Sequence, residues 1–496
     1  MREKKREQRS IYLILYLLII VVLSCVLVFS CTSSGGDNGG SLIDEGDPYI
    51  IEDPAGDSYS SVQTIVLDEE FIYCGGRDNA SGDDLWRVEK RRRDDGSLVT
   101  GFATDGVLYS VAVEIGGQGI VRELQVDDSS LFICGDANGI PYRIERRDKV
   151  TGELVTSFGT DGYIVSYSTG QPGDQYLDFT IDGDYLYIIG GNDLPGNEQW
   201  FIEKRSKASG ALVAAFEDHT IDDGAYEPVA VNGVVQSNPS TGEDQPTGIV
   251  VDGEYIFVCG RDYLPGSTYQ MRVEKRSKTT GVLVSAFEDH TIVDGTYVPV
   301  AVNGVVQSNP GAGYEFFNSV AVDGDYLYLA GSNWLDGYDW NAEFWIEKRN
   351  KTTGALVTAF EDHTIVDSDY TPIPINGVVQ SNTTVDRDLL YAIAVDADAV
   401  YVAGMDDLGG EQWHIEKRDK TTGDLVADFE EHSIDAGAKP VTTVGGVVQS
   451  NASTYWDWPS DIVVDRSFIF CAGWYSPGDI RKWRIEKRYK SSGAYE

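Results

Sequence analysis

Seven copies of one short pattern constrain the fold of this chain more than any other feature of its sequence. The copies read "RVEKR", "RIERR", "FIEKR", "RVEKR", "WIEKR", "HIEKR" and "RIEKR", with glutamates at positions 89, 145, 203, 274, 347, 416 and 486. Each copy sits in a long repeat of short apolar or alternating segments separated by Gly and Asp turns. Such repeats predict an all-β protein built as a β-propeller rather than as a helical solenoid.

One repeat shows the blade that we expect. Its four predicted strands are "SVAVDG" at 319–324, "YLYLAG" at 326–331, "FWIEKRN" at 344–350 and "ALVTAF" at 355–360. Tight turns with Gly join the first strand to the second and the third to the fourth. Four strands make one blade, so seven copies predict a seven-bladed β-propeller of four-stranded blades.

The two ends of the chain are expected to complete one blade together. The last repeat stops at "SGAYE", where its fourth strand should begin, whereas residues 49–68 match residues 163–182 in length and spacing. The sequence therefore predicts a ring closed by the N-terminal strand, which leaves no open sheet edge.

The repeat resembles the repeats of known propeller families. "VDGDYLYLAG" and "WIEKRNKTTGALVTAF" resemble NHL-type repeats, pyrroloquinoline-quinone-type propellers and the sixty-residue repeats of bacterial secreted proteins, with "TSFGTDG" from Thr156 as the nearest local match. The resemblance covers roughly residues 49–496 and implies a propeller fold rather than one activity. Quinone-dependent propellers use a vicinal cysteine pair, and no Cys-Cys occurs in this sequence. The resemblance therefore disfavours a quinoprotein dehydrogenase.

The N-terminus predicts export. A basic start, "MREKKREQRS", precedes an apolar stretch at 11–30, long enough to span a bilayer or enter a secretion channel. Cys31 follows in "VFSC", which resembles a bacterial lipoprotein signal and makes Cys31 the candidate lipidation site, although Phe29 departs from that pattern. Cys25 is a weaker candidate, and a retained membrane anchor is the alternative. We expect a signal or anchor at 1–31, a flexible Gly/Ser-rich tether at 32–47 and the propeller at 48–496.

Composition limits the partners. The chain has 80 Asp plus Glu against 39 Lys plus Arg, a formal net charge of -41 that repels nucleic acid and anionic lipid headgroups. We expect no nucleic-acid partner and membrane contact only through the N-terminal anchor. Solubility or a salty environment accounts for such acidity, and a cation-binding surface is the alternative.

Four cysteines are expected to be buried small hydrophobic residues, with disulfides as the alternative. They are Cys74, Cys134, Cys259 and Cys471.

No cofactor is predicted, and calcium is left open as a ligand. The acidic pairs Asp222 with Asp223 and Asp406 with Asp407 do not match an ordered calcium-loop spacing. Thirteen-residue "EDH" insertions occur in four consecutive repeats, and their histidines belong to different blades, which disfavours one shared metal. We expect the Asp of "EDH" to cap a turn and the His to contact the neighbouring insertion, with a metal role as the alternative. The histidines are His219, His290, His363 and His432.

Residues that recur in all seven repeats are interpreted as structural, and residues that vary between repeats are the candidates for function. The glutamates and arginines of the repeated pattern are interpreted as structural ion pairs, with Glu347 and Arg349 on one face of their strand. Tight turns should share one face of the ring. The insertions and the variable loops should share the other, here called the loop-rich face.

Aromatic residues on the loop-rich face are the candidate ligand-binding residues, because aromatic rings suit sugar stacking or protein contacts. Covering the core under long loops is the alternative interpretation. The candidates are Trp334, Tyr338, Trp340, Tyr455, Trp456, Trp458, Trp474 and Tyr475.

These features predict an exported, surface-tethered binding module for a glycan, an envelope component or a protein partner. No nucleophile and base can be identified, so an enzyme is the less favoured hypothesis. The alternatives are a lyase or hydrolase that uses a carboxylate or cation in the central channel, and a structural surface or assembly protein.

Overall fold

The computed structural model describes most of the repeat region. Its described residues are 49–52, 59–79, 82, 84–110, 119–137, 140–166, 177–194, 197–221, 232–238, 242–264, 268–292, 303–310, 313–334, 341–365, 375–382, 387–407, 410–434, 444–478 and 480–496. The chain divides into two units, Met1–Asp44 and Glu45–Glu496, and all of these residues belong to the second. The predicted signal, tether and lipidation site at Cys31 lie outside them. No helix that could cross a membrane occurs in the described part of the chain.

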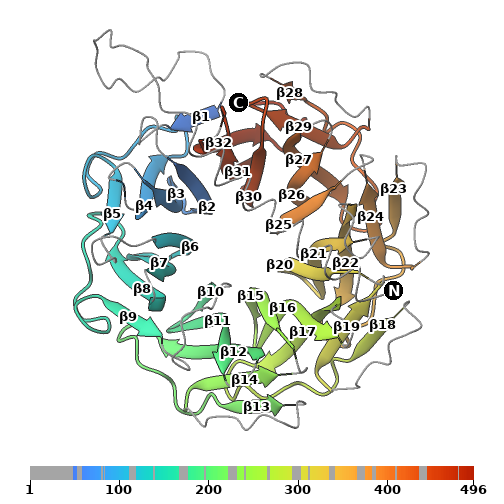
Figure 1. Ribbon diagram of the computed structural model, residues 1–496, viewed down its shortest axis with the longest axis horizontal. Coiled ribbons are helices and arrows are strands. Elements are labelled where there is room, and N and C mark those ends of the chain that lie inside the picture. Colours follow the sequence, from blue (N-terminus) through green and yellow to red (C-terminus); the bar gives the residue numbers. More distant parts are fainter. Residues whose placement is uncertain are drawn as a thin grey trace, which may run out of the picture. The chain divides into compact units, whose positions relative to one another are not determined.

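The protein is an all-β, seven-bladed ring, as the repeats predicted (Figure 1). Seven separate sheets surround the centre, and the first strand of each sheet lies innermost. Within a blade, the first three strands run antiparallel to one another. We number the blades in chain order.

Blades 1, 2 and 7 have four strands. From the inside outward these are β2 (Ser60–Leu67), β3 (Phe71–Asp78), β4 (Leu85–Arg92) and β5 (Val107–Ser110); β6 (Gly119–Val126), β7 (Ser130–Ala137), β8 (Ile140–Asp148) and β9 (Tyr163–Ser166); and β30 (Asp457–Val464), β31 (Phe468–Tyr475), β32 (Lys482–Tyr489) and β1 (Tyr49–Glu52).

Blades 3 to 6 have five strands. From the inside outward, blades 3 and 4 contain β10 (Leu177–Asp182), β11 (Tyr185–Leu194), β12 (Asn197–Ser206), β14 (Val234–Asn238) and β13 (Asp218–Ile221); and β15 (Gln245–Asp252), β16 (Tyr255–Leu264), β17 (Thr268–Ser277), β19 (Val305–Asn309) and β18 (Asp289–Ile292). Blades 5 and 6 contain β20 (Glu315–Asp323), β21 (Tyr326–Trp334), β22 (Ala342–Asn350), β24 (Val378–Asn382) and β23 (Asp362–Ile365); and β25 (Leu389–Val395), β26 (Ala399–Asp407), β27 (Glu411–Asp419), β29 (Val447–Asn451) and β28 (Ser433–Ile434).

The predicted fourth strand at 355–360 is wrong. This segment forms a single bridge, between Leu356 and Arg349, and then turns. Of its six residues only Phe360 is buried, where it packs edge-on against Tyr328 with ring centroids 6.1 Å apart. The fourth strand is instead β24, which pairs antiparallel with β22. The apolar segment therefore anchors the turn by one side chain and does not extend the sheet.

The "DHTI" segments are also placed differently from the expectation. They form β13, β18, β23 and, in shorter form, β28, each parallel to the fourth strand at the outer edge of its blade. They widen the blade and are not loops on the loop-rich face.

Every blade is tied to the preceding one by an ion pair at the tight turns. A basic residue after the third strand contacts an aspartate at the end of the first strand of the preceding blade or directly after it. The pairs are Lys149–Asp68, Lys207–Asp127, Lys278–Asp182, Lys351–Asp252, Lys420–Asp323, Lys490–Asp396 and Arg93–Asp465. The last pair joins blade 1 to blade 7, so the ring is continuous across the seam between the two ends of the repeat region.

A shared apolar cluster also holds this seam. Val62 and Cys74 of blade 1 pack with Phe470 and Trp483 of blade 7, and the Trp483 Nε1–H donates to the Arg77 carbonyl at 3.1 Å. The N-terminal strand β1 pairs antiparallel with β32, with Tyr49 opposite Glu486. That β1 is what closes the ring stays a prediction.

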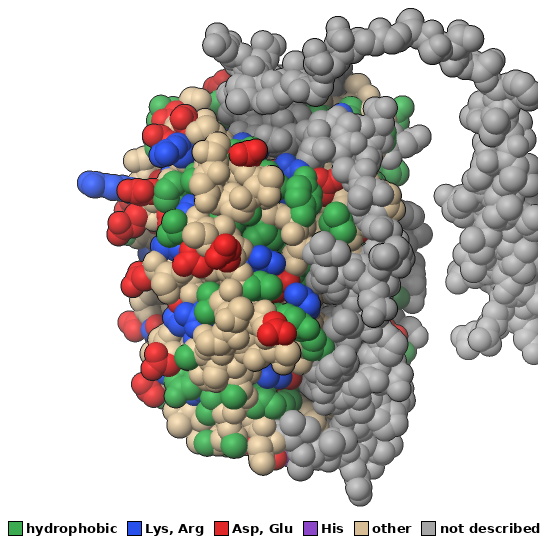
Figure 2. Space-filling view, turned by 90° about the vertical axis from the view of Figure 1, so that its left-hand side faces the viewer, with side chains coloured by type: hydrophobic (Ala, Val, Ile, Leu, Met, Phe, Trp, Pro, Cys, Tyr) green, Lys and Arg blue, Asp and Glu red, His purple; other side chains and the backbone are tan. Residues whose placement is uncertain are grey.

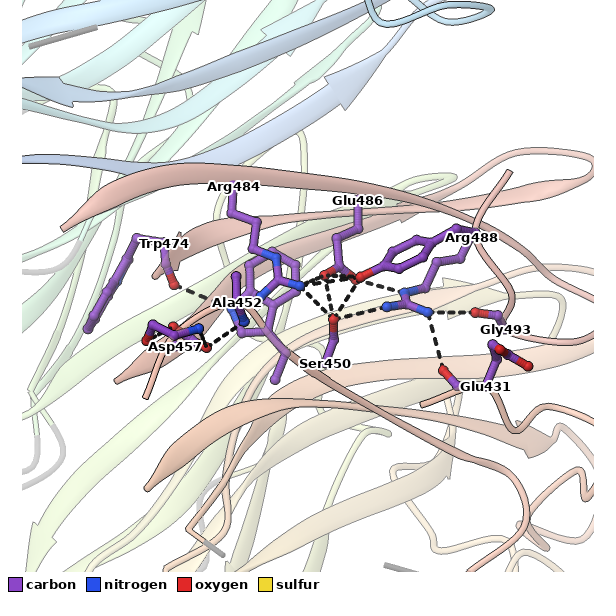
Figure 3. Close-up of polar contacts among 12 residues, drawn as sticks. Glu431, Ser450, Ala452, Asp457, Trp474, Arg484, Glu486, Arg488 and Gly493 are labelled. Carbon is purple, nitrogen blue, oxygen red and sulfur yellow. Dashed lines mark hydrogen bonds and ion pairs between the residues drawn. The ribbon is translucent and has the colours of Figure 1, made fainter. Parts of the chain in front are cut away.

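The seven repeated glutamates form a buried ionic scaffold, as predicted. In blade 7 the Glu486 carboxylate lies 2.6 Å from Arg484 and 2.7 Å from Arg488, and it accepts the Ser450 hydroxyl of blade 6 at 2.6 Å (Figure 3). In the same way, a serine hydroxyl of the preceding blade donates to Glu145, Glu274, Glu347 and Glu416. The pattern therefore joins blades, and each repeated glutamate pairs with at least one arginine of its own strand.

Acidic and basic side chains alternate on the side of the ring formed by the first blades. Figure 2 shows that carboxylates, which gather toward one edge of this view, are interspersed with lysines and arginines. On this side of the ring, basic side chains thus lie among the acidic ones.

Candidate binding site on the loop-rich face

Six residues from blades 6, 7 and 1 lie at one edge of the ring. Inner strands begin at this edge and second strands end there, so it belongs to the loop-rich face. Tyr391 and Trp458 stand near the starts of β25 and β30, Trp474 and Arg77 near the ends of β31 and β3, and Arg481 and Tyr59 directly before β32 and β2. We call this set the aromatic–arginine row: Tyr391, Trp458, Trp474, Arg481, Tyr59 and Arg77.

Ring stacking connects the first half of the row. Tyr391 and Trp458 are stacked with centroids 5.8 Å apart and planes 22° apart. Trp458 and Trp474 follow at 5.2 Å and 34°. Offset contacts of this kind stabilise aromatic pairs beyond their buried area. The three rings therefore form one continuous apolar strip across blades 6 and 7.

Guanidinium groups continue the row. The Arg481 Cζ lies 3.9 Å from the Trp474 ring centroid and 5.1 Å from that of Tyr59. The Arg77 Cζ lies 4.3 Å from the Tyr59 centroid. Cations above aromatic faces are attracted by the ring electrons. The row thus crosses the seam between blades 7 and 1.

Polar groups flank the aromatic strip. The Trp458 Nε1–H donates to the Glu411 carboxylate, which also pairs with Arg387. Burial raises the pKa of Glu411, although these two contacts act in the opposite direction. Trp334 packs against the same buried apolar cluster as Tyr391 and Trp458. Among the described residues, the buried Trp334 Nε1–H and Tyr391 hydroxyl find no hydrogen-bond partner.

A rigid loop beside the row presents two exposed aromatic side chains. The fully buried Asp457 carboxylate accepts the Ala452 N–H at 2.9 Å, the Ser453 N–H at 3.0 Å and the Ser453 hydroxyl at 2.6 Å (Figure 3). The Ser476 N–H donates to the Trp456 carbonyl at 2.9 Å, which fixes the loop to the end of β31. Tyr455 and Trp456 are 52% and 55% exposed. The backbone is thus held while both rings face solvent.

The structure separates the eight predicted aromatic residues into groups. Tyr455 and Trp456 are exposed, and Trp458 and Trp334 are half-buried in or beside the row. Trp474 and Tyr475 were expected to be exposed and are instead buried: both are paired residues of β31, and Trp474 is covered by the Trp458 ring and the Arg481 guanidinium. Tyr338 and Trp340 lie outside the described residues.

Sequence reasoning missed Tyr59, Arg77, Tyr391 and Arg481. One signal pointed to part of this set: the residue after the conserved glycine of the second strand breaks the sevenfold symmetry. Registers place Arg77, Asp136, Gly191, Arg261, Ser332, Met405 and Trp474 at that position. Six residue types occupy this position in the seven blades, with Arg in blades 1 and 4, so the blade does not fix its side chain and it is free to serve a ligand.

Three carboxylates on inner strands form a second titratable group. Glu123, Asp178 and Asp461 each stand four residues before the aspartate of the tight turn. Burial raises the pKa of Asp178 to about 7, with repulsion from Asp461 adding to the shift, and burial raises the pKa of Asp461 to about 6. Burial and the two aspartates also raise the pKa of Glu123.

Two of these carboxylates also join neighbouring blades. Asp178 accepts the Ile249 N–H at 3.0 Å and Asp461 accepts the Ile65 N–H at 2.9 Å. No group of three His, Cys, Asp or Glu side chains suited to a metal ion occurs among the described residues.

The "EDH" residues act differently from the expectation. Asp218, Asp289 and Asp362 do not cap turns; each pairs at 2.7 Å with an arginine of the next blade, Arg276, Arg349 or Arg418. His219, His290 and His363 bond the glutamate two residues earlier in their own insertion, as in His219–Glu217 at 3.2 Å, whereas His432 accepts the Gln449 N–H at 3.2 Å. The aspartates thus pair across blades, and the histidines contact their own blade.

The remaining acidic pairs and cysteines are placed as follows. Asp406, one of the residues left open for calcium, is buried and bonded to His414 and Gln449, whereas Asp222 and Asp223 lie outside the described residues. The four cysteines are buried and free.

No family model and no curated protein matches the chain. Solved structures with some similarity include Drosophila Plexin A in complex with Semaphorin 1b, at 10% identity over 88% of this chain and 86% of that chain, with a TM-score of 0.42. Sqt1 from Chaetomium thermophilum matches at 11% identity over 89% and 84%, with a TM-score of 0.39. The GH43 endo-arabinanase from Bacillus licheniformis matches at 9% over 60% and 94%, with a TM-score of 0.31. Scores this low carry no argument about function, and the fold rests on the strand pairing of the chain itself.

Proposed function

We propose that this protein is an exported, surface-tethered binding module that holds a glycan or protein partner on its loop-rich face, at Tyr455, Trp456 and the adjoining row. The observation that carries the proposal is the presentation of Tyr455 and Trp456. Two neighbouring aromatic side chains are more than half exposed on a loop that a buried aspartate fixes.

Physical reasons support a binding role for this loop. Exposed aromatic rings provide large contact area at a small cost in side-chain entropy, and a fixed backbone lowers the ordering cost of binding. The other exposed aromatic side chains of the described region, Tyr109, Tyr255 and Tyr489, stand singly. The row adds a half-buried apolar strip with polar groups at its side, which is the composition of a ligand site.

The test is capture of partners by residues 48–496. The protein is applied to a glycan array and to surface extracts, and the Tyr455→Ala, Trp456→Ala double variant is compared with a Tyr255→Ala control. Tyr255 is also exposed and begins β16 at the tight turns. We expect the double variant to lose capture and the control to keep it. Equal capture by both variants would reject this site.

A second candidate function rests on the inner-strand carboxylates. Asp178 and Asp461, with pKa values of about 7 and 6, lie in the range suited to proton transfer near neutral pH. A lyase or hydrolase using them should lose turnover in Asp178→Asn and keep partner capture at Tyr455 and Trp456. The assay measures release of new chain ends from polysaccharides by the wild-type protein and by Asp178→Asn, and it distinguishes an enzyme from a binding module.

A further inference from the structure

We propose that Arg481 recognises a carboxylate, and that the ligand of the row is a carboxylate-bearing sugar. This inference rests on the proposed function, because it names the chemical class of ligand for the same face.

The pairing of Arg481 differs from that of the scaffold arginines. Eleven arginines beside the repeated glutamates each form an ion pair with that glutamate. Arg481 is half-buried, yet among the described residues no carboxylate oxygen lies within 4.0 Å of its guanidinium. A partly buried charge without a counterion is unfavourable. An anionic ligand would remove this cost.

Burial also lowers the pKa of Arg481, and Arg77 acts in the same direction, whereas Tyr59 and Glu411 oppose the shift. Glu411, the carboxylate that acts on this pKa, pairs with Arg387, and Asp84 pairs with Arg77 at 3.4 Å and accepts the Asn79 side-chain amide at 2.6 Å. Among the described residues, the positive charge of Arg481 in the row therefore has no paired counterion.

The orientation of Arg481 favours a planar anion. The Trp474 and Tyr59 rings lie against the guanidinium at 3.9 Å and 5.1 Å. The Arg481 carbonyl accepts the Ser60 N–H at 2.9 Å, which fixes the backbone across the seam. Guanidinium N–H groups point outward in the plane of the group, so stacking on its faces leaves them available for a carboxylate.

The surroundings favour a sugar over an acidic peptide. Trp458 and Tyr391 supply a stacked aromatic strip beside Arg481, and aromatic rings suit the apolar faces of sugar rings. The net charge of -41 repels a polyanion at long range, whereas screening over about 8 Å at physiological ionic strength tolerates one or two negative charges. A short acidic oligosaccharide fits both conditions.

The experiment compares a uronate trisaccharide with its methyl ester by isothermal titration. The proteins are wild type, Arg481→Gln, Arg481→Lys and the charge-matched control Arg466→Gln, which removes an exposed arginine at a tight turn. We expect Arg481→Gln to weaken binding of the acid by about tenfold to a hundredfold and to leave the ester unchanged. Arg481→Lys should recover part of the loss, and Arg466→Gln should bind as wild type does. Thermal unfolding checks that each variant is folded.

Three outcomes would overturn the inference. Equal binding of acid and ester by every protein, together with loss of both in the Tyr455→Ala, Trp456→Ala variant, rejects carboxylate recognition and keeps the proposed binding function. Binding of an acidic peptide but of no sugar, lost in Arg481→Gln, rejects the sugar class. No binding of any probe, and no capture on the array, rejects the inference and the proposed function together.

Discussion

Replacing Asp178 by Asn should stabilise the protein at pH 8 and should have little effect at pH 4. Burial is the main reason that the pKa of Asp178 is raised from 3.8 to about 7, and the repulsion from Asp461 adds to it, while N–H groups of Ile249 and Phe179 oppose the shift. Between pH 3.8 and about pH 7, the folded state holds the proton on Asp178 more tightly than the unfolded state does. The stabilisation is therefore complete below pH 3.8 and is lost as pH rises through about 7.

The magnitude follows from the shift. A difference of about three pKa units, each equivalent to about 1.4 kcal/mol, gives a ceiling of about 4 kcal/mol in the free energy of unfolding. Glu123 and Asp461 share this effect, so a single substitution should recover only part of it. Asparagine carries no charge, and its carbonyl oxygen can still accept the Ile249 N–H.

The assay is urea unfolding at pH 4 and pH 8, with Asp398→Asn as the control. Asp398 is an exposed carboxylate in the turn between β25 and β26, so its replacement makes the same change in charge. We expect a higher midpoint for Asp178→Asn at pH 8 only. Equal effects at both pH values, or destabilisation at pH 8, would refute the reasoning.

Three further predictions concern the scaffold. Burial disfavours charge on His414, but hydrogen bonds to Asp406 and Glu416 raise its pKa to about 10, so its stabilisation is complete below about pH 6.5 and is lost as pH rises through about 10. Arginine occupies this position in blades 1, 2, 4 and 7. His414→Arg should therefore remove the loss of stability at high pH, measured by denaturant unfolding, and an unchanged pH profile would contradict the assignment. Deleting Tyr49–Glu52 exposes the edge of β32 and should lower the thermal midpoint and increase light scattering; unaltered values would show that β1 is not needed for closure. Asp362→Ala removes the 2.7 Å contact with the buried Arg418 of the next blade and should cost about 1–3 kcal/mol in urea unfolding, and no loss would mean that Glu416 alone satisfies Arg418.

The repeats made the fold accessible from the sequence, because a unit copied seven times shows which features build a blade. The predicted fourth strand was wrong because an apolar segment does not always pair with the sheet. "ALVTAF" at 355–360 is apolar, but only Phe360 is buried, and the edge of β22 is taken by "VVQSN" at Val378–Asn382. Comparing "NGVVQS" with "DGVLYS" of blade 1 and "DGYIVS" of blade 2, which lack the insertion, could have revealed the fourth strand.

The site was only partly accessible from the sequence. Tyr455 and Trp456 stand out because they are adjacent and interrupt the repeat. Arg481 and Tyr59 lie more than 400 positions apart, and only the seam between blades 7 and 1 brings them to one ring contact. Exposure was also not readable: Trp474 and Trp456 look alike in the sequence, yet one is 3% and the other 55% exposed, because only the first is a strand residue facing a neighbouring ring.

Hydrogen exchange of residues 48–496 with and without a captured partner shows directly whether the loop-rich face binds. If the loop-rich face binds, amides at 452–458 and 474–478 should be protected on addition of the partner, and the tight turns after β15 and β20 should exchange as before. Protection confined to the tight turns, or no protection anywhere despite saturating partner, would contradict the account.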